Sequence, residues 1–253
     1  MAYSDFLTWR DNDLDPVDLS IVIPTYNESE RILPTLGAMA VIVSGLGYRW
    51  ELIVSDDGSK DGTADLVESL GWKNLLVVRH ANTGKGGAVR RGVLAARGGR
   101  VLFADADNST PIEELPRLMQ QLDAGYDLAV GSRVGEGASE ENKSAARKLV
   151  SGSLRLVTRV LSGVTVRDTQ CGFKLFGPRS RRLFELQKMQ GFSFDLELLY
   201  LAHKLGLRVA EVPVRWFDAP GSKVNSVQDS VKFLKDIFAV RRLDQQGAYE
   251  GKL

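Results

Sequence analysis

Cysteine, net charge and long apolar runs are scarce in this chain of 253 residues, and each scarcity excludes a class of protein. The single cysteine, Cys171, excludes an intrachain disulfide framework and is compatible with a reducing compartment. The formal net charge of +1 argues against a protein that works mainly by wrapping nucleic acid. No apolar run reaches the roughly 18 to 20 residues that a membrane-spanning helix needs, so we expect no transmembrane segment.

The N-terminal segment is acidic. Residues 1–18 have neither the basic start nor the apolar core of a signal peptide, and they carry aspartates at positions 5, 11, 13, 15 and 18. We therefore expect a cytoplasmic protein that begins with a tail over residues 1–18. The apolar content of 43% predicts a sizeable core, and we expect residues 19–253 to form a single domain.

Apolar runs alternate with helical patterns in the first half of the chain. This alternation predicts an α/β fold, with a Rossmann-like, mostly parallel sheet and helices on both faces. Strands are expected at residues 19–24, 50–55, 75–78, 101–104 and 127–131. Ligands bind such sheets outside the carboxyl ends of the strands. Polar clusters follow four of these ends, at residues 25–28, 56–62, 105–109 and 132–133.

The pattern changes after residue 133. We expect residues 19–133 to form a nucleotide half and residues 134–253 to form an acceptor half that ends in an amphipathic helix. The expected elements of the second half are a polar loop at 135–143, a basic helix at 145–161, a helix at 194–205, a strand at 208–216 and the final helix, which begins near residue 227.

Two aspartates, Asp105 and Asp107, directly follow the expected strand at 101–104. At a spacing of i and i+2 in an extended turn, both side chains face one small volume. Two carboxylates this close repel each other unless a cation lies between them, and a hard divalent ion such as Mg²⁺ or Mn²⁺ takes oxygen ligands. The pair therefore predicts a metal site for a diphosphate-bearing substrate. The alternative is an Asp-rich turn between a strand and a helix.

Three further clusters suit a nucleotide. Tyr26 and Glu28 would stack on a base and bind a ribose or base edge, unless they only form a turn before a helix. One of Asp56 and Asp57 would contact the ligand. Lys85 lies in a Gly-rich loop that is neither a P-loop nor a dinucleotide fingerprint. This loop suits a phosphate or nucleoside contact at a helix N-terminus, and the alternative is a plain loop before a helix.

The fifth expected strand ends in Gly131-Ser132-Arg133, where the arginine would clamp phosphate or carboxylate. Together these segments resemble family 2 glycosyltransferases with the GT-A fold, and within that family the dolichyl-phosphate (polyprenyl-phosphate) β-glucosyltransferases. The most specific stretch is Asp-Thr-Gln-Cys-Gly-Phe-Lys-Leu-Phe at 168–176. The other matching stretches run in family order over roughly residues 19–242, at 23–28, 56–62, 84–89, 103–107, 131–133, 194–199 and 221–223.

The resemblance implies a donor site for a UDP-sugar. Lys85 would lie near the nucleotide, and Asp105 and Asp107 would hold Mg²⁺ or Mn²⁺ against the diphosphate, Asp107 more directly. Ala106, between them, would belong to the substrate-binding set. Ser109 stands where mannosyl relatives supply a third metal-site side chain, a glutamine. The residues that would hold the uridine are Pro24, Tyr26, Glu28, Asp56 and Asp57.

The resemblance also implies an acceptor site. The acceptor phosphate would be bound by Arg133, Arg147 and Lys223. Asp195 and Glu197 would hydrogen-bond the sugar or orient an arginine. The catalytic set would be Asp107, Arg133 and Asp195.

The implied reaction is an inverting, metal-dependent transfer of a hexose from a UDP-sugar to polyprenyl or dolichyl phosphate. Glucose is the hexose that we expect first. A phosphate monoester is mostly dianionic at pH 7, so no strong general base is needed. A basic helix, at 145–161 or at the C-terminus, would lie on the inner membrane surface as a peripheral contact. The alternative for the final helix is packing on the core.

Three rival functions remain open at this point. The first is a glycosyltransferase with a soluble phosphorylated or sugar acceptor, which would share the donor site. The second is a non-catalytic module that binds a nucleotide sugar. The third is a nucleotide-dependent oxidoreductase, which the missing glycine fingerprint after the first strand disfavours.

Overall fold

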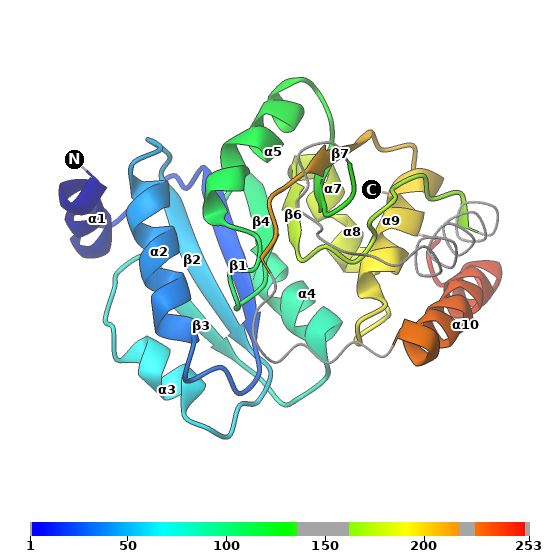
Figure 1. Cartoon of the computed structure of the whole chain (residues 1–253), viewed down its shortest axis with the longest axis horizontal. Helices are drawn as coiled ribbons and strands as arrows, with labels where there is room; N and C mark the ends of the chain where they lie inside the picture. The colour runs from blue at the N-terminus through cyan, green and yellow to red at the C-terminus, as the bar shows by residue number, and fades with distance from the viewer. Residues whose placement is uncertain (1, 136–161, 218–225, 251–253) are drawn as a thin grey trace.

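The structure, a computed structural model, describes residues 2–135, 162–217 and 226–250 of the chain (Figure 1). These residues form one sheet of seven strands in the order β3-β2-β1-β4-β6-β5-β7. The strands are β1 (Leu19–Thr25), β2 (Trp50–Asp56), β3 (Leu75–Arg79), β4 (Arg100–Ala104), β5 (Leu128–Ser132), β6 (Phe173–Phe176) and β7 (Val209–Pro213). The helices are α1 (Ala2–Asp11), α2 (Ile32–Ser44), α3 (Thr63–Glu68), α4 (Lys85–Ala95), the 3₁₀ turn η1 (Ile112–Glu114), α5 (Leu115–Asp123), α7 (Pro178–Arg181), α8 (Leu183–Leu186), α9 (Phe194–Lys204) and α10 (Ser226–Gln245).

The sheet is mostly parallel. Strands β3, β2, β1 and β4 run parallel to one another, as do β5 and β7, whereas β6 runs antiparallel to both β4 and β5. The structure therefore confirms the predicted α/β fold, and the five expected strands of the first half appear as β1 to β5. Strand β6 was not expected, because it is short and carries Lys174 among apolar residues.

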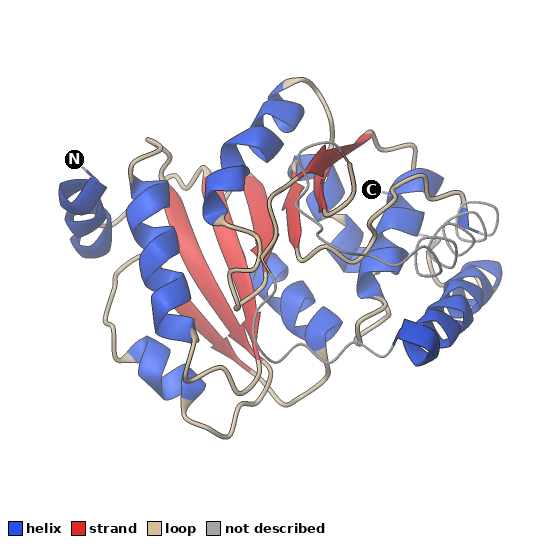
Figure 2. Ribbon diagram, viewed as in Figure 1, coloured by secondary structure: helices blue, strands red, loops and turns tan. Residues whose placement is uncertain are grey.

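Helices cover both faces of the sheet (Figure 2). Successive side chains of a strand point to opposite faces, so Ile21 and Ile23 of β1 pack in one apolar cluster and Val22 packs in another. The first cluster contains apolar residues of α2 and α5, and the second contains residues of α4, α8 and α9. Strands buried on both faces are rich in apolar residues, which is why the sequence pattern identified them.

The segment before β1, expected as a tail, contains helix α1. Trp9 of this helix is buried and stacks on Trp50 of β2, with ring centroids 4.2 Å apart. Its indole N–H donates a hydrogen bond to the Trp50 carbonyl at 2.7 Å. The helix is thus held against the sheet by an aromatic contact. The division of the chain at residue 18 and the two predicted halves stay predictions.

Two predicted acceptor residues, Arg147 and Lys223, lie outside the described residues, as does the expected basic helix at 145–161. The expected final helix is present as α10, which packs on α9 and lies at the opposite end of the molecule from α1 (Figure 1). Of the helices that the structure describes, none combines the length and the apolar character needed to cross a bilayer.

Candidate active site

The turn after β1 carries two of the predicted uridine residues. Pro24 lies beside Ser55 in the register of β1 and β2, and the Tyr26 ring that follows is 47% exposed. The Glu28 carboxylate accepts a hydrogen bond from Arg31 Nη2 at 3.0 Å. This bond raises the pKa of the Arg31 guanidinium, and the nearby charge of Asp107 adds to the effect. Arg31 was not among the residues expected here, and it brings a cation close to the predicted metal loop.

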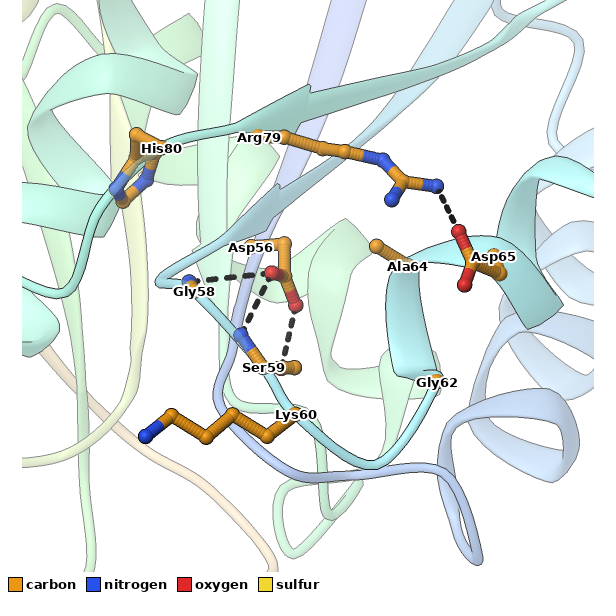
Figure 3. A pocket seen from close by; sticks show the side chains of 9 residues that line it. All are labelled: Asp56, Gly58, Ser59, Lys60, Gly62, Ala64, Asp65, Arg79 and His80. Atoms are coloured by element: carbon orange, nitrogen blue, oxygen red, sulfur yellow. Dashed lines mark hydrogen bonds and ion pairs between the residues drawn. The ribbon is translucent and has the colours of Figure 1, made fainter.

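Asp56, at the end of β2, holds its own loop. Its carboxylate accepts hydrogen bonds from the backbone N–H groups of Gly58 at 3.1 Å and Ser59 at 2.9 Å, and from the Ser59 hydroxyl at 2.5 Å (Figure 3). Gly58 has a φ of 78°, and a Cβ there would lie 3.1 Å from the backbone nitrogen of Asn82. Only glycine suits this turn, because it combines a left-handed conformation with a close backbone approach.

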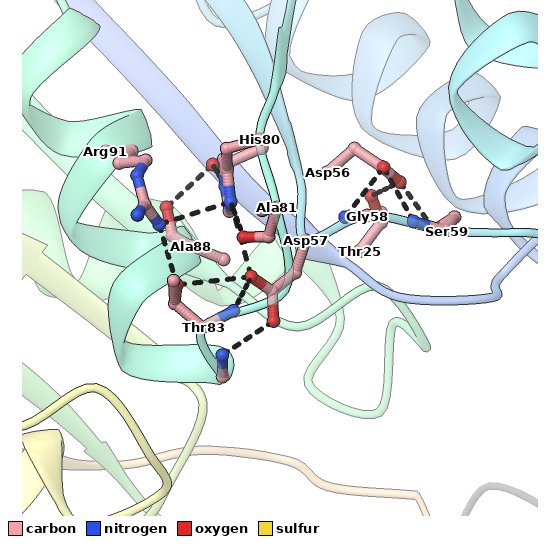
Figure 4. Close-up of polar contacts among 12 residues, drawn as sticks. Thr25, Asp56, Asp57, Gly58, Ser59, His80, Ala81, Thr83, Ala88 and Arg91 are labelled. Carbon is pink, nitrogen blue, oxygen red and sulfur yellow. Dashed lines mark hydrogen bonds and ion pairs between the residues drawn. The ribbon is translucent and has the colours of Figure 1, made fainter.

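Asp57 holds the next loop, between β3 and α4. It accepts hydrogen bonds from the backbone N–H groups of Thr83 and Gly84, both at 2.8 Å, and its Oδ1 lies 3.3 Å from His80 Nδ1 (Figure 4). His80 in turn lies 3.2 Å from the Ser55 hydroxyl. Both carboxylates are buried and have partners within the protein, so a uridine contact by either one stays a prediction.

A polar pocket of about 380 Å³ opens between the β2–α3 loop and the end of β3 (Figure 3). Asp56, Lys60, Arg79 and His80 are among the residues that line it. Arg79 Nη2 lies 2.6 Å from Asp65 Oδ1. Asp56, which lines this pocket, directly precedes Asp57 in the chain. The predicted metal and phosphate residues lie elsewhere, at the start of α4 and just after β4 and β5.

Lys85 begins α4 and reaches the end of β4. Its Nζ lies 2.6 Å from Asp105 Oδ1. Burial lowers the pKa of the Lys85 ammonium, but the negative charges of Asp105 and Asp195 outweigh this effect and leave the pKa above its ordinary value. The lysine is therefore a fixed positive charge beside the predicted metal carboxylate at neutral pH.

The position of Asp105 depends on Gly172. The backbone N–H of Asp105 donates to the Gly172 carbonyl at 3.0 Å. A Cβ on Gly172 would lie 1.9 Å from Asp105 Oδ2. The segment before β6 thus packs against the carboxylate itself, and no larger residue fits at position 172 without moving it.

The second carboxylate, Asp107, lies in a tight turn. Its Oδ1 accepts a hydrogen bond from the backbone N–H of Ser109 at 2.9 Å, and Asn108 between them has a left-handed φ of 52°. Ala106 is buried, and its carbonyl accepts a hydrogen bond from the Thr35 hydroxyl at 2.8 Å. The predicted metal loop is therefore attached to α2.

The oxygens of this loop suit a divalent ion that binds together with a diphosphate. The amide oxygen of Asn108, the residue after Asp107, is buried and has no hydrogen-bond partner among the described residues. Within the described part of the chain, no three His, Cys, Asp or Glu side chains gather into a cage that could hold an ion alone. Mg²⁺ typically binds one or two carboxylates and completes its shell with water and substrate phosphates. The donor set therefore fits Mg²⁺ or Mn²⁺.

Arg133 follows β5 and is oriented by Asp168. Its Nε and Nη2 donate to the two carboxylate oxygens at 2.8 and 2.9 Å, and its guanidinium lies 5.5 Å from the centre of the Trp216 ring. Burial raises the pKa of Asp168, but the hydrogen bonds and charge of Arg133 outweigh it and leave the pKa below its ordinary value. The fork of the arginine is thereby held in one orientation.

Asp195, the third predicted catalytic residue, is buried in the first turn of α9. Its Oδ1 lies 2.5 Å from Nζ of Lys174, which also donates to the Cys171 carbonyl at 2.6 Å. Burial raises the pKa of the Asp195 carboxyl, and the charge of Asp105 acts in the same direction. Pairing with Asp195 explains how a lysine is accommodated in the core, because a buried charge needs a partner.

The interpretation of Glu197 as a sugar contact is wrong. Its side chain is fully buried, and the carboxylate accepts hydrogen bonds from the backbone N–H groups of Lys188 and Met189 and from the Tyr249 hydroxyl. The structure instead gathers Lys85, Asp105 and Asp195 into one group of interacting charges. The sequence offered no signal for these pairings, because the partners come from distant segments.

Open α/β sheets bind their ligands outside the carboxyl ends of the strands, which is where these charges lie. The family model for glycosyl transferase family 2 matches residues 20–183. A dolichyl-phosphate beta-glucosyltransferase from Dictyostelium discoideum is 34% identical over 247 residues, which cover 91% of this chain and 76% of the relative. A protein of the same name from Saccharomyces cerevisiae is 32% identical over 260 residues, covering 94% and 78%. The chain belongs to glycosyltransferase family 2.

The structure of glucosyl-3-phosphoglycerate synthase from Mycobacterium tuberculosis, in complex with Mn²⁺ and UDP-glucose, is similar to the whole fold. The TM-score is 0.65 at 22% identity, and the match covers 95% of this chain and 83% of the other. At this level of identity the likeness concerns the fold, which is the GT-A fold expected from the sequence. With the family, it identifies the chain as a glycosyltransferase.

Substitution of Gly172 tests the placement of Asp105. The new methyl group of Gly172→Ala would displace the Asp105 carboxylate, and we expect the initial rate of glycosyl transfer to fall about 100-fold. Gly37→Ala is the control, since a Cβ on Gly37 in α2 meets nothing within 4 Å. Equal rates for the two variants would show that transfer does not depend on the position of Asp105.

The ion pair of Asp168 and Arg133 predicts a pH-dependent stability. The folded pKa of Asp168 lies below the unfolded value of about 3.9, so the pair stabilises the fold above that pH and loses this contribution as the pH falls through the folded pKa. We expect Asp168→Asn to lower the free energy of unfolding by about 2 kcal/mol at pH 7, and by less near pH 3.5, in urea titrations. Asp123→Asn, at an exposed ion pair with Arg100, should change it by under about 1 kcal/mol. A pH-independent effect of Asp168→Asn would contradict the assignment.

Proposed function

We propose that this glycosyltransferase transfers glucose from UDP-glucose to the phosphate of a dolichyl or polyprenyl lipid, with inversion at the anomeric carbon. The observation that carries the proposal is the contact of Lys85 with Asp105 beside Asp107, a charge arrangement suited to a metal-bound diphosphate. It occurs in a chain whose relatives from Dictyostelium discoideum and Saccharomyces cerevisiae are named dolichyl-phosphate beta-glucosyltransferases.

The donor would lie across the carboxyl ends of β1, β2 and β4. Its uridine would contact the exposed Tyr26 ring and the loops that Asp56 and Asp57 hold, with Pro24 and Glu28 at the same turn. Lys85 would contact the diphosphate. Asp105 and Asp107 would hold Mg²⁺ or Mn²⁺, which when bound neutralises the departing UDP. The related fold from Mycobacterium tuberculosis contains both Mn²⁺ and UDP-glucose, which supports this choice of donor and metal.

The acceptor phosphate would be bound by Arg133, whose guanidinium Asp168 keeps oriented, together with Arg147 and Lys223. One phosphate oxygen would attack the anomeric carbon as the bond to UDP breaks. Because the phosphate is already mostly dianionic at pH 7, proton removal is not required. Asp195 is paired with Lys174, an arrangement that favours orienting neighbouring groups over accepting a proton.

Helix α10 offers a surface for peripheral membrane contact on the cytoplasmic side. Lys235, Phe238 and Arg242 follow one another at spacings of three and four residues and are exposed, while Ile237 and Val240 face the core. Cations and an exposed aromatic ring on one helix face suit an anionic lipid surface.

Vesicle flotation tests this contact. We expect the protein to float with vesicles that contain phosphatidylserine. Phe238→Ser should reduce the bound fraction several-fold, because it removes an exposed apolar side chain that would enter the membrane surface. Leu94→Ser removes an exposed apolar side chain of α4 and should leave flotation unchanged. Equal loss in both variants, or no flotation of the wild-type protein, would contradict the assignment to α10.

Transfer of labelled glucose tests the function. We expect label from UDP-glucose to enter an organic-extractable product when polyprenyl phosphate and Mg²⁺ or Mn²⁺ are present. Asp107→Ala should lower this rate by about 100-fold or more, because the diphosphate loses its principal metal carboxylate. Asp123→Ala, at an exposed carboxylate of α5, should retain the wild-type rate.

The remaining outcomes separate the alternatives. Metal-dependent release of UDP without label in the lipid phase would move the acceptor to a soluble phosphorylated molecule or sugar. Binding of UDP-glucose without any release of UDP would indicate a non-catalytic binding module. A near-normal rate for Asp107→Ala would overturn the metal assignment.

A further inference from the structure

The Glu197 carboxylate organises a backbone segment that no part of the proposed reaction uses directly. Its Oε1 accepts the N–H of Lys188 and its Oε2 accepts the N–H of Met189, both at 2.9 Å. The hydroxyl of Tyr249 donates to Oε1 at 2.6 Å. Both side chains are buried, so these bonds form in a region with little competition from water.

The segment so held, residues 187–191, packs directly on the start of α4. The Gly87 N–H donates to the Gln190 carbonyl at 3.0 Å, and Nε2 of Gln187 donates to the Gly86 carbonyl at 2.9 Å. A Cβ on Gly84 would lie 2.8 Å from the Gln190 carbonyl oxygen, and one on Gly86 would lie 2.9 Å from that of Met189. Close backbone contacts and the Gln187 side chain join the two segments, so we expect displacement of one to displace the other.

Lys85 lies between these contacts. Its neighbours Gly84 and Gly86 both abut the 187–191 segment, and its ammonium reaches Asp105 at 2.6 Å. A continuous path of hydrogen bonds and backbone contacts therefore runs from Tyr249 through Glu197 and the 187–191 segment to Lys85.

A specific turn brings Tyr249 to this position. Helix α10 ends in a Schellman motif, in which Ala248 N–H bonds the Leu243 carbonyl and Gly247 N–H bonds the Asp244 carbonyl, both at 3.0 Å. Gly247 has the required left-handed φ of 75°. The reversed chain inserts Tyr249 into the core beside α9. Burial and the adjacent Glu197 carboxylate raise the pKa of Tyr249, so the hydroxyl keeps the proton that it donates.

We propose that Tyr249 and Glu197 are positioning residues, which hold the 187–191 segment against the start of α4 and thereby set the Lys85 ammonium beside Asp105. The effect on sugar transfer rests on the proposed function, because Lys85 acts there on the diphosphate of the donor. The structural effect, order in the 187–191 segment and in the start of α4, does not depend on it.

The test compares two Tyr→Phe variants. Tyr249→Phe removes the hydroxyl that fixes Glu197. Tyr200→Phe is the matched control, because Tyr200 of α9 donates to Asp244 of α10 at 2.5 Å. Each variant thus loses one hydrogen bond from a tyrosine to a carboxylate in the same pair of helical regions.

Amide hydrogen exchange gives the readout that is independent of activity. We expect Tyr249→Phe to speed exchange of the Lys188 and Met189 amides and of the first turn of α4 about tenfold, and Tyr200→Phe to leave them unchanged. In steady-state kinetics, Tyr249→Phe should raise KM for UDP-glucose about 5- to 10-fold with kcat within about twofold, because donor contact is weakened while the reacting groups remain.

Three outcomes are decisive. Equal exchange and equal KM in the two variants would overturn the proposal. Faster exchange at the named amides with an unchanged KM would overturn the coupling to Lys85. If the wild-type protein shows no transfer, the proposed function fails by itself. The exchange rates and the Kd for UDP, compared between Tyr249→Phe and Tyr200→Phe, then still decide the positioning role.

Glu197→Gln provides a second variant. An amide in place of the carboxylate presents an N–H group to one of the two backbone donors, so we expect a larger exchange effect than in Tyr249→Phe. Because both residues act on one segment, amide exchange in the double variant should be no faster than in Glu197→Gln alone. Additive effects of the two substitutions would show independent roles and overturn the proposed path.

Discussion

This site depends on one kind of interaction, the hydrogen bond from a backbone N–H group to a buried carboxylate. Asp56, Asp57 and Glu197 each accept two backbone N–H bonds, and each fixes a loop that no helix or strand would otherwise define. Such bonds are stronger than neutral ones and remain effective in a buried environment. These loops are thereby given rigid shapes, although their residues have little secondary structure of their own.

Three cations of the site are also paired, each with a carboxylate. Lys85 is matched with Asp105, Arg133 with Asp168 and Lys174 with Asp195. A buried charge without a partner is costly, so each lysine and arginine is held in one position by its neighbour. A donor diphosphate and an acceptor phosphate would enter a region where positive charge is already oriented, and little reorganisation is then needed at the moment of reaction.

Much of the fold could be predicted from the sequence, because strands buried on both faces produce uninterrupted apolar runs. This applies to β1, β2, β4 and β5, whereas β3 lies at the edge of the sheet and is only partly buried. It fails for β6, where Lys174 interrupts the run and is accommodated only because Asp195 lies across from it. The candidate metal loop was also predictable, since Asp105 and Asp107 are close in the sequence.

Partners that are distant in the sequence could not be predicted. Asp57 holds a loop 26 residues away, and Glu197 receives Tyr249 from 52 residues away. Hydrophobic period and local turn chemistry contain no information about such pairs. The same limit explains the wrong interpretation of Glu197: two acidic residues at i and i+2 in a helix do not share a face. Asp195 therefore meets Lys174, and Glu197 meets Tyr249.

The glycines of α4 have a consequence for the order of folding. Gly86, Gly87 and Gly92 each lower intrinsic helix stability by about 1 kcal/mol relative to alanine, so this segment has little tendency to be helical alone. Its stabilising partners include Gln187, which follows Gly86 by 101 residues. As the chain emerges from the ribosome, α4 can pack on β1 and β2 at once, but its set of contacts is complete only after synthesis has passed α8.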